Sequence, residues 1–177
     1  FTSCGTEANN WILRSAVRDL KVKRIILSKI EHHAVLHTVE SLQKEFEIQV
    51  DYVSVKPNGE IDITDLVDLL SQETKTLVSL MHVNNETGTL LNVEIFHSDM
   101  VQSVGKLEID LQHFPIHFMV ASAHKFHGPK GIGFAFIKKN SGLQPLFFGG
   151  EQEKGLRPGT EAVHQIAGMA KALELSY

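Results

Sequence analysis

The chain has 177 residues, which is enough for one domain with a buried core. Apolar residues make up 42% of it and charged residues 21%, ordinary proportions for a globular protein. The formal net charge of −4 gives no electrostatic basis for binding nucleic acid or an anionic membrane, and no apolar run approaches the length that a bilayer span requires.

The cysteine count and the first residue bear on the origin of the chain. Cys4 is the only cysteine, so an internal disulfide is excluded and a reducing compartment such as the cytoplasm is expected. The chain opens at Phe1, with neither a methionine nor a charged-then-apolar signal segment. We therefore expect it to be part of a longer cytoplasmic protein.

Helices and strands are predicted to alternate along the first half of the chain. The first helix is expected to follow Gly5, with Thr6 as its N-cap, and a glycine at that point lets backbone N–H groups close on an anion. A second helix is predicted over 33–46, and a third begins near Asp62 or Thr64. The strands expected between them cover 24–28, 48–55 and 76–83.

In the second half, the stretch 118–133 places a lysine directly after a buried strand. The apolar run 118–121 predicts that strand, and a glycine- and proline-rich turn leads to another strand at 132–138. Lys125 lies between them, where a lysine has no packing role. A lysine in a partly desolvated cleft can form a Schiff base with a carbonyl, although a lysine taken alone is more often a solvated loop residue.

The last predicted helix begins close to Thr160. Its apolar residues recur at helical spacing and are expected to share one face: Val163, Ile166, Ala167 and Ala170.

Strands that alternate with helices predict an α/β fold with a mainly parallel sheet covered on both faces. In such sheets ligands bind at the carboxyl ends of the strands. Polar residues gather at those predicted ends: Glu31 and His32, Asn84 and Asn85, Asp99, and His124 and Lys125. This pattern predicts a single site at one sheet edge.

The connection from Thr89 to Asp99 does not fit this scheme. It is too short to hold a crossover helix between two strands, and a parallel connection normally needs a dozen or more residues. We therefore expect residues to be missing from the sequence between about 90 and 96.

A lysine, an aspartate, a histidine and a phosphate cradle at one edge suit pyridoxal phosphate, whose aldehyde, ring nitrogen and phosphate need those groups. The motifs resemble the cysteine desulfurase group of the class V aminotransferase family, fold-type I pyridoxal-phosphate enzymes. They lie in the family's order over nearly the whole chain, at 3–7, 31–35, 82–88, 97–102, 122–133 and 149–161.

The resemblance implies a seven-stranded-type sheet sandwiched by helices. It also implies that residues 1–177 form most of the cofactor-binding large domain, without the N-terminal segment and the small C-terminal domain. The nucleophilic cysteine that carries sulfur as a persulfide, and the arginine that binds the substrate carboxylate, would then lie beyond Tyr177.

The resemblance also implies a role for each catalytic residue. Lys125 would hold the cofactor and shuttle the substrate's α-proton. Asp99 would pair with the pyridinium nitrogen, and His32 would stack on the ring face and assist proton transfer. Gln102 would reach the ring oxygen, and Asn85 would bond near that oxygen or the substrate. His33, the neighbour of His32, is interpreted as a helix-start residue without a catalytic role.

Five further residues would bind phosphate if the resemblance holds. Gly5, Thr6, Ser122 and His124 would hold the phosphate of the chain's own cofactor. Thr160 resembles a residue that reaches the phosphate of the other subunit's cofactor, so a homodimer is implied.

Two positions depart from the family's pattern. Cys4 stands where the family usually has glycine, beside the phosphate loop, and is interpreted as a small buried thiol distinct from the persulfide cysteine. Met100 replaces a usual alanine, which is interpreted as packing variation.

The leading hypothesis is a cysteine desulfurase, which converts L-cysteine to L-alanine and delivers sulfur for iron–sulfur clusters or tRNA thiolation. An iron–sulfur scaffold or another sulfur-acceptor protein would be its partner. Selenocysteine lyase, of the same family, remains an alternative, as does a non-catalytic truncated paralogue that acts as a dimer partner. A metal-dependent hydrolase with His124, His127 and Asp99 as ligands is less favoured, because it leaves Lys125 and Thr6 without a role; no metal site is predicted.

Overall fold

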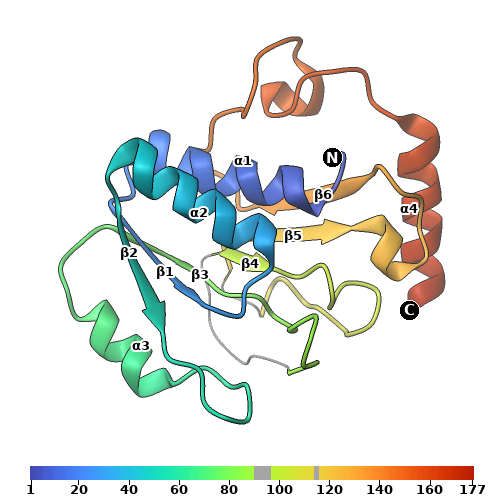
Figure 1. Ribbon diagram of the computed structural model, residues 1–177. Helices are drawn as coiled ribbons and strands as arrows, with labels where there is room; N and C mark the ends of the chain where they lie inside the picture. The colour runs from blue at the N-terminus through green and yellow to red at the C-terminus, as the bar shows by residue number, and fades with distance from the viewer. Residues whose placement is uncertain (90–96, 114–115) are drawn as a thin grey trace.

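The computed structural model describes residues 1–89, 97–113 and 116–177, and its centre is a six-stranded sheet (Figure 1). The strands lie side by side in the order β2-β1-β3-β4-β5-β6. Every neighbouring pair is parallel except β5 and β6, which are antiparallel. Their bounds are β1 Arg24–Ser28, β2 Gln49–Val53, β3 Thr76–Ser79, β4 His97–Asp99, β5 Phe118–Ser122 and β6 Gly133–Ile137.

In the described residues, four α-helices and two short 3₁₀ helices surround this sheet. The α-helices are α1 Gly5–Arg18, α2 His33–Phe46, α3 Ile63–Leu70 and α4 Val163–Ser176, and the 3₁₀ helices are η1 Ala123–Phe126 and η2 Gln152–Gly155. Helices α1 and α2 pack together on one face of the sheet, with apolar residues of both in one core cluster. Residues of α3, η1 and α4 belong to a second cluster on the opposite face.

The strands divide their side chains between these two clusters. In β1, Ile25 and Leu27 join the cluster under α1 and α2, whereas Ile26 joins the other. In β5, Phe118 and Val120 likewise join the cluster under α1 and α2, whereas Met119 joins the cluster on the other face. Alternation of side chains across a strand produces this division, and the central strands therefore read as continuous apolar runs because both faces are buried.

The predicted α/β fold with a mainly parallel, helix-covered sheet is confirmed. The described residues supply six strands rather than the seven of the expected type. The chain before α1 adds only an antiparallel bridge at the outer edge of β6, between Thr2 and Gly133, whose backbone groups exchange hydrogen bonds of 2.9 and 2.8 Å.

The start of α1 differs from its prediction. The helix begins at Gly5 itself, and its N-cap residue is Cys4, which makes no side-chain capping bond. Thr6 therefore lies within the first turn instead of capping it. The third helix follows expectation more closely, because the Asp62 side chain caps α3 by accepting from the backbone N–H groups of Thr64 and Asp65.

Three predicted strands are shorter in the structure: 48–55 becomes Gln49–Val53, 76–83 becomes Thr76–Ser79, and 132–138 becomes Gly133–Ile137. After Ser79 the chain still contacts β4, since the backbone N–H groups of Leu80 and His82 donate to the carbonyl oxygens of His97 and Asp99 at 3.2 and 3.1 Å. It then forms the loop that carries Asn84 and Asn85. Strands β3 and β4 are parallel, with Ser79 paired to His97. The expected gap between about 90 and 96 lies outside the described residues.

The predicted apolar face of α4 is for the most part not covered by other elements. Val163 is 71% exposed, and Ala167 and Ala170 are also exposed. Of the four predicted residues, Ile166 does pack against the core cluster that contains the buried Met169. The helix carries apolar residues on more than one side, and only the side that faces η1 and its neighbours is covered.

Candidate functional site

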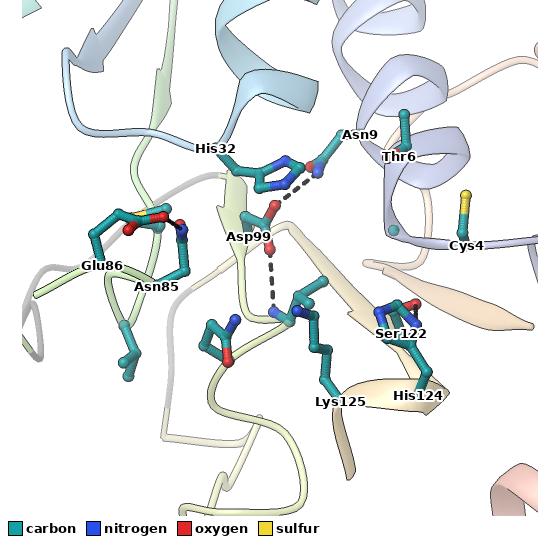
Figure 2. A pocket seen from close by; sticks show the side chains of 15 residues that line it. Cys4, Thr6, Asn9, His32, Asn85, Glu86, Asp99, Ser122, His124 and Lys125 are labelled. Carbon is teal, nitrogen blue, oxygen red and sulfur yellow. Dashed lines mark hydrogen bonds between the residues drawn. The ribbon is translucent and has the colours of Figure 1, made fainter. Parts of the chain in front are cut away.

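A cleft of about 440 Å³ lies at the edge of the sheet where β1, β3, β4 and β5 end (Figure 2). The first turns of α1, the turn between β1 and α2, the loop after β3, the turn after β4 and helix η1 all contribute to it. Its walls comprise Cys4, Gly5, Thr6, Asn9, His32, Met81, Val83, Asn85, Glu86, Asp99, Val101, Gln102, Ser122, His124 and Lys125.

Of the ten site residues predicted from the sequence, nine line this cleft, and Thr160 does not. Thr160 is exposed and borders a second, smaller hollow with Phe1 and Arg157. The Arg157 guanidinium holds that segment beside the start of α1 through a 2.9 Å ion pair with Glu7. A role for Thr160 toward another subunit therefore stays a prediction.

Asp99 forms the floor of the cleft. It is the last residue of β4 and only 7% exposed. One carboxylate oxygen accepts a hydrogen bond of 2.8 Å from the Asn9 amide, and the other accepts one of 3.1 Å from the backbone N–H of Val101. Burial raises the pKa of Asp99 above its ordinary value, while these two bonds and the nearby His32 and Lys125 act in the opposite direction.

Asn9 is the main site residue that the sequence-based prediction missed. It is buried within α1, and its side chain joins that helix to Asp99 across 90 residues of sequence. The available signal was spacing, since Asn9 follows Gly5 by four residues and so shares its helix face. Nothing in the sequence paired it with Asp99, because that contact depends on how α1 packs over the sheet.

Lys125 lies in η1, the 3₁₀ turn that directly follows β5. Its side chain is exposed at the cleft, so the expected partial desolvation is not seen in this chain. Just before Lys125, the Ser122 hydroxyl and His124 Nδ1 lie 3.0 Å apart and form a hydrogen bond. Partial desolvation and the ammonium groups of Lys125 and Lys130 lower the pKa of His124, which favours its neutral form.

The start of α1 offers backbone donors to the cleft. The side chain of the N-cap residue Cys4 makes no capping hydrogen bond in the described part of the chain. The first backbone N–H groups of α1 are therefore available to a ligand. Gly5 is needed here for packing, since a Cβ would lie 2.9 Å from a methyl carbon of Val101. Cys4 itself is half-buried at the cleft wall, which corrects its interpretation as a buried thiol.

His32 is fixed at the opposite side of the cleft by its role in α2. It is the N-cap residue of that helix, and its Nδ1 accepts a 3.0 Å hydrogen bond from the backbone N–H of Ala34. The other ring nitrogen is then the one that carries a proton when the ring is neutral. His33 begins α2 and stacks on His37, in agreement with its interpretation as a helix-start residue.

Two amide side chains at the cleft are tied to their neighbours. Gln102 lies in the turn after β4, and its side-chain oxygen accepts a 2.9 Å hydrogen bond from Lys106. The Asn85 amide donates a 2.6 Å bond to Glu86. Both side chains line the cleft.

The arrangement suits an elongated ligand with an anionic group at one end and a protonated nitrogen at the other. Helix N–H groups, the Ser122 hydroxyl and His124 lie at the first end, and the Asp99 carboxylate lies at the second. Lys125 provides an amine to the same cleft. Within residues 1–89, 97–113 and 116–177, no three His, Cys, Asp or Glu side chains are placed to hold a metal ion.

None of the helices in the described part of the chain has the length and apolarity that a membrane crossing requires.

Comparison with known proteins gives consistent matches. Residues 1–176 match the class V aminotransferase family. A cysteine desulfurase IscS from Clostridium botulinum is 41% identical over 189 aligned residues, covering 99% of this chain and 47% of that protein. The structure matches a NifS-like protein with a TM-score of 0.93 at 39% identity, covering 99% of this chain and 52% of the other. It also matches the structure of SspA in complex with cysteine, with a TM-score of 0.88, 34% identity, and coverages of 98% and 54%. The chain thus spans about half the length of the relatives it matches.

Proposed function

This chain belongs to the class V aminotransferase family, and on that premise we propose that it is the cofactor-binding part of a pyridoxal-phosphate-dependent cysteine desulfurase. The observation that carries the proposal is the composition of one cleft. A lysine amine, a buried carboxylate and a helix N-terminus with hydroxyl and imidazole neighbours line the same cavity.

These groups fit the three polar parts of pyridoxal phosphate. Lys125 would hold the aldehyde, Asp99 would hold a proton at the ring nitrogen, and the phosphate would lie among the α1 N–H groups, Thr6, Ser122 and His124. When bound, this cofactor supplies a conjugated ring that withdraws electrons from the α-carbon of an amino acid. The protein's part is to orient the ring and to move protons.

Proton transfer falls to the residues at the rim. Lys125 Nζ would take the α-proton of the substrate and deliver a proton to the product. Its amine is exposed at the cleft and can therefore reach a bound substrate. His32 would cover one face of the ring and assist that transfer with the ring nitrogen that does not accept from Ala34. Asn85 and Gln102 would orient the cofactor through its ring oxygen.

L-cysteine is proposed as the substrate, since the related proteins are named cysteine desulfurases and SspA is described in complex with cysteine. The reaction would yield L-alanine and sulfur held as a persulfide, for delivery to an iron–sulfur scaffold or another acceptor protein. A homodimer, with Thr160 reaching the partner's cofactor, belongs to the same proposal.

A spectroscopic experiment on the full-length protein tests the cofactor assignment. We expect a visible absorption band that borohydride abolishes while fixing the cofactor to the chain at Lys125. The Lys125→Ala variant should lose covalent attachment completely. Lys130→Ala is the matched control, because Lys130 is an exposed lysine in the following turn.

The substrate is tested separately by measuring sulfide and alanine released from L-cysteine, with selenocysteine in a parallel assay. A protein that stays colourless with added pyridoxal phosphate, or that is labelled equally well in Lys125→Ala, would refute the proposal. Turnover of selenocysteine alone would move the assignment to a lyase of that substrate.

A further inference from the structure

A buried carboxyl group lies behind the cleft, at a position to which the proposed mechanism gives no role. Glu31 precedes His32 in the turn between β1 and α2, and it is only 5% exposed. A buried glutamate without a cationic partner is rare, since burial strongly disfavours its charged form. Its contacts therefore show what the group does.

Both hydrogen bonds to this carboxyl go to a single oxygen. Glu31 Oε1 accepts a 2.8 Å bond from the hydroxyl of Ser28 and a 3.1 Å bond from the backbone N–H of Met81. Glu31 Oε2 is buried and has no hydrogen-bond partner among the described residues. This asymmetry matches a carboxylic acid, with Oε1 as its carbonyl oxygen and the proton on Oε2. An ionised group would leave one charged oxygen bare.

The same contacts join two walls of the cleft. Ser28 ends β1, whereas Met81 follows β3 and lines the cleft. A second tie runs parallel to the first, because the Asn84 amide donates a 2.9 Å hydrogen bond to the carbonyl oxygen of Ile30. The turn that carries His32 is thereby fastened to the loop that carries Asn85.

We propose that Glu31 is a positioning residue that remains protonated, clamping the His32 turn to the loop after β3 and leaving the single negative charge of the buried carboxyl pair on Asp99. The proposal rests on the proposed function, since it is the charge on Asp99 that would hold the proton at a cofactor's ring nitrogen.

The electrostatics support this division of charge. Burial is the main cause that raises the pKa of Glu31 to about 8, and the negative charge of Asp99 adds to the rise. Asp99 has two bonded oxygens and the nearby His32 and Lys125, which favour its charged form, whereas Glu31 has one bare oxygen. When two carboxyl groups share a site, the one with better support keeps the charge.

The pH dependence of folding tests the protonated state directly. Glu31 has a folded pKa above its unfolded value, so its contribution to stability is complete below about pH 4.5 and is lost as the pH rises toward 8. Glu31→Gln removes this proton linkage and keeps an oxygen for Ser28 and Met81. Between those pH values, we expect the ratio of the wild-type unfolding constant to that of the variant to rise about tenfold per pH unit.

Glu40→Gln is the matched control, because Glu40 is exposed on α2. Its unfolding constant should keep a ratio to wild type that does not change with pH. Other buried groups, such as His97 with a pKa lowered to about 3 by burial, act equally in all three proteins and cancel in the ratios.

The positioning role is tested by titrating each protein with pyridoxal phosphate at neutral pH. Glu31→Ala removes both hydrogen bonds and should weaken binding about ten- to a hundredfold, since small displacements of site residues have large effects. Glu31→Gln should restore most of that loss. Equal losses in both variants, or an unfolding ratio for Glu31→Gln that is flat with pH, would overturn the proposal. A wild-type protein that binds no cofactor would refute the proposed function while the unfolding experiment still decides the state of Glu31.

Discussion

The floor and the rim of the cleft are built in different ways. On the floor, Asp99 is buried, and both of its oxygens are held by hydrogen bonds from separate parts of the chain. On the rim, Lys125 and His124 are exposed, and within the described part of the chain His124 has one hydrogen-bond partner, Ser122, two positions away. The floor is therefore fixed by the tertiary packing, whereas the rim depends on local turns that leave its side chains free to meet a ligand.

This difference predicts that floor substitutions can alter folding as well as chemistry, while rim substitutions alter ligand binding or proton transfer and leave folding unchanged. Proteins commonly place their rigid supports in the packed scaffold and their contacts with ligands on loops. Three substitutions test whether the floor and the rim differ in this way.

Asp99→Asn should have the largest effect. The amide keeps the shape of the carboxyl but cannot hold a proton at a cofactor's ring nitrogen, so the cofactor should remain bound while turnover falls about a hundredfold or more, about 2.7 kcal/mol of barrier. Visible absorbance would check occupancy, and alanine release from L-cysteine would check turnover. Turnover at the wild-type rate would remove Asp99 from the mechanism.

Asn9→Ala should have an intermediate effect on both properties. Removing the donor to a buried carboxylate should lower the free energy of unfolding by about 1–3 kcal/mol. It should also raise the pKa of Asp99 further, so the acid limb of the pH–activity profile should move to higher pH. Urea unfolding and a pH profile measure the two effects.

Asn10→Ala provides the control for this substitution. Asn10 is the next residue of α1, and its amide donates to the carbonyl oxygen of Thr6 in the same helix. The acid limb of the pH–activity profile of Asn10→Ala should match that of the wild type. A displaced limb in Asn10→Ala would mean that α1 as a whole, and not the Asn9 hydrogen bond, sets the charge of Asp99.

His124→Gln should have the smallest effect and should act on the ligand alone. Loss of the imidazole should weaken pyridoxal phosphate binding by about 1 kcal/mol, roughly fivefold, as expected for one hydrogen bond. The free energy of unfolding should stay within about 0.5 kcal/mol of wild type, since the side chain is exposed. A cofactor titration and a urea melt of the same sample test both numbers. A stability loss above about 1 kcal/mol would show that the rim is also structural.

Much of the cleft could be predicted from the sequence because its residues follow strand ends. Asp99 is the last residue of β4, and Lys125 and His32 follow the ends of β5 and β1 by three and four residues. Parallel strands bring their carboxyl ends to one edge, so a local pattern was sufficient to gather them. Sequence alone could not place Thr160, because it follows no strand and its position depends on the long segment after β6.

The same sequence patterns did not predict which side chains are buried or which residues they contact in the folded chain. Glu31 reads as a polar turn residue beside His32, yet the loop after β3 covers it and turns it into a buried acid. Helix α4 shows the converse, since Val163 and Ala170 fit an apolar stripe and remain exposed. In both cases the sequence shows which residues share a face but not whether another element covers that face.

From the sequence alone we could predict the alternation of helices and strands, the mainly parallel sheet and the edge at which the polar residues meet. These follow from spacing along the chain, which is a local property. Three features became visible only in the folded molecule: Asn9 donates to Asp99, Glu31 is buried against Ser28 and Met81, and Lys125 remains exposed. Those features depend on which surfaces exclude water, and exclusion of water is set by segments far apart in the sequence.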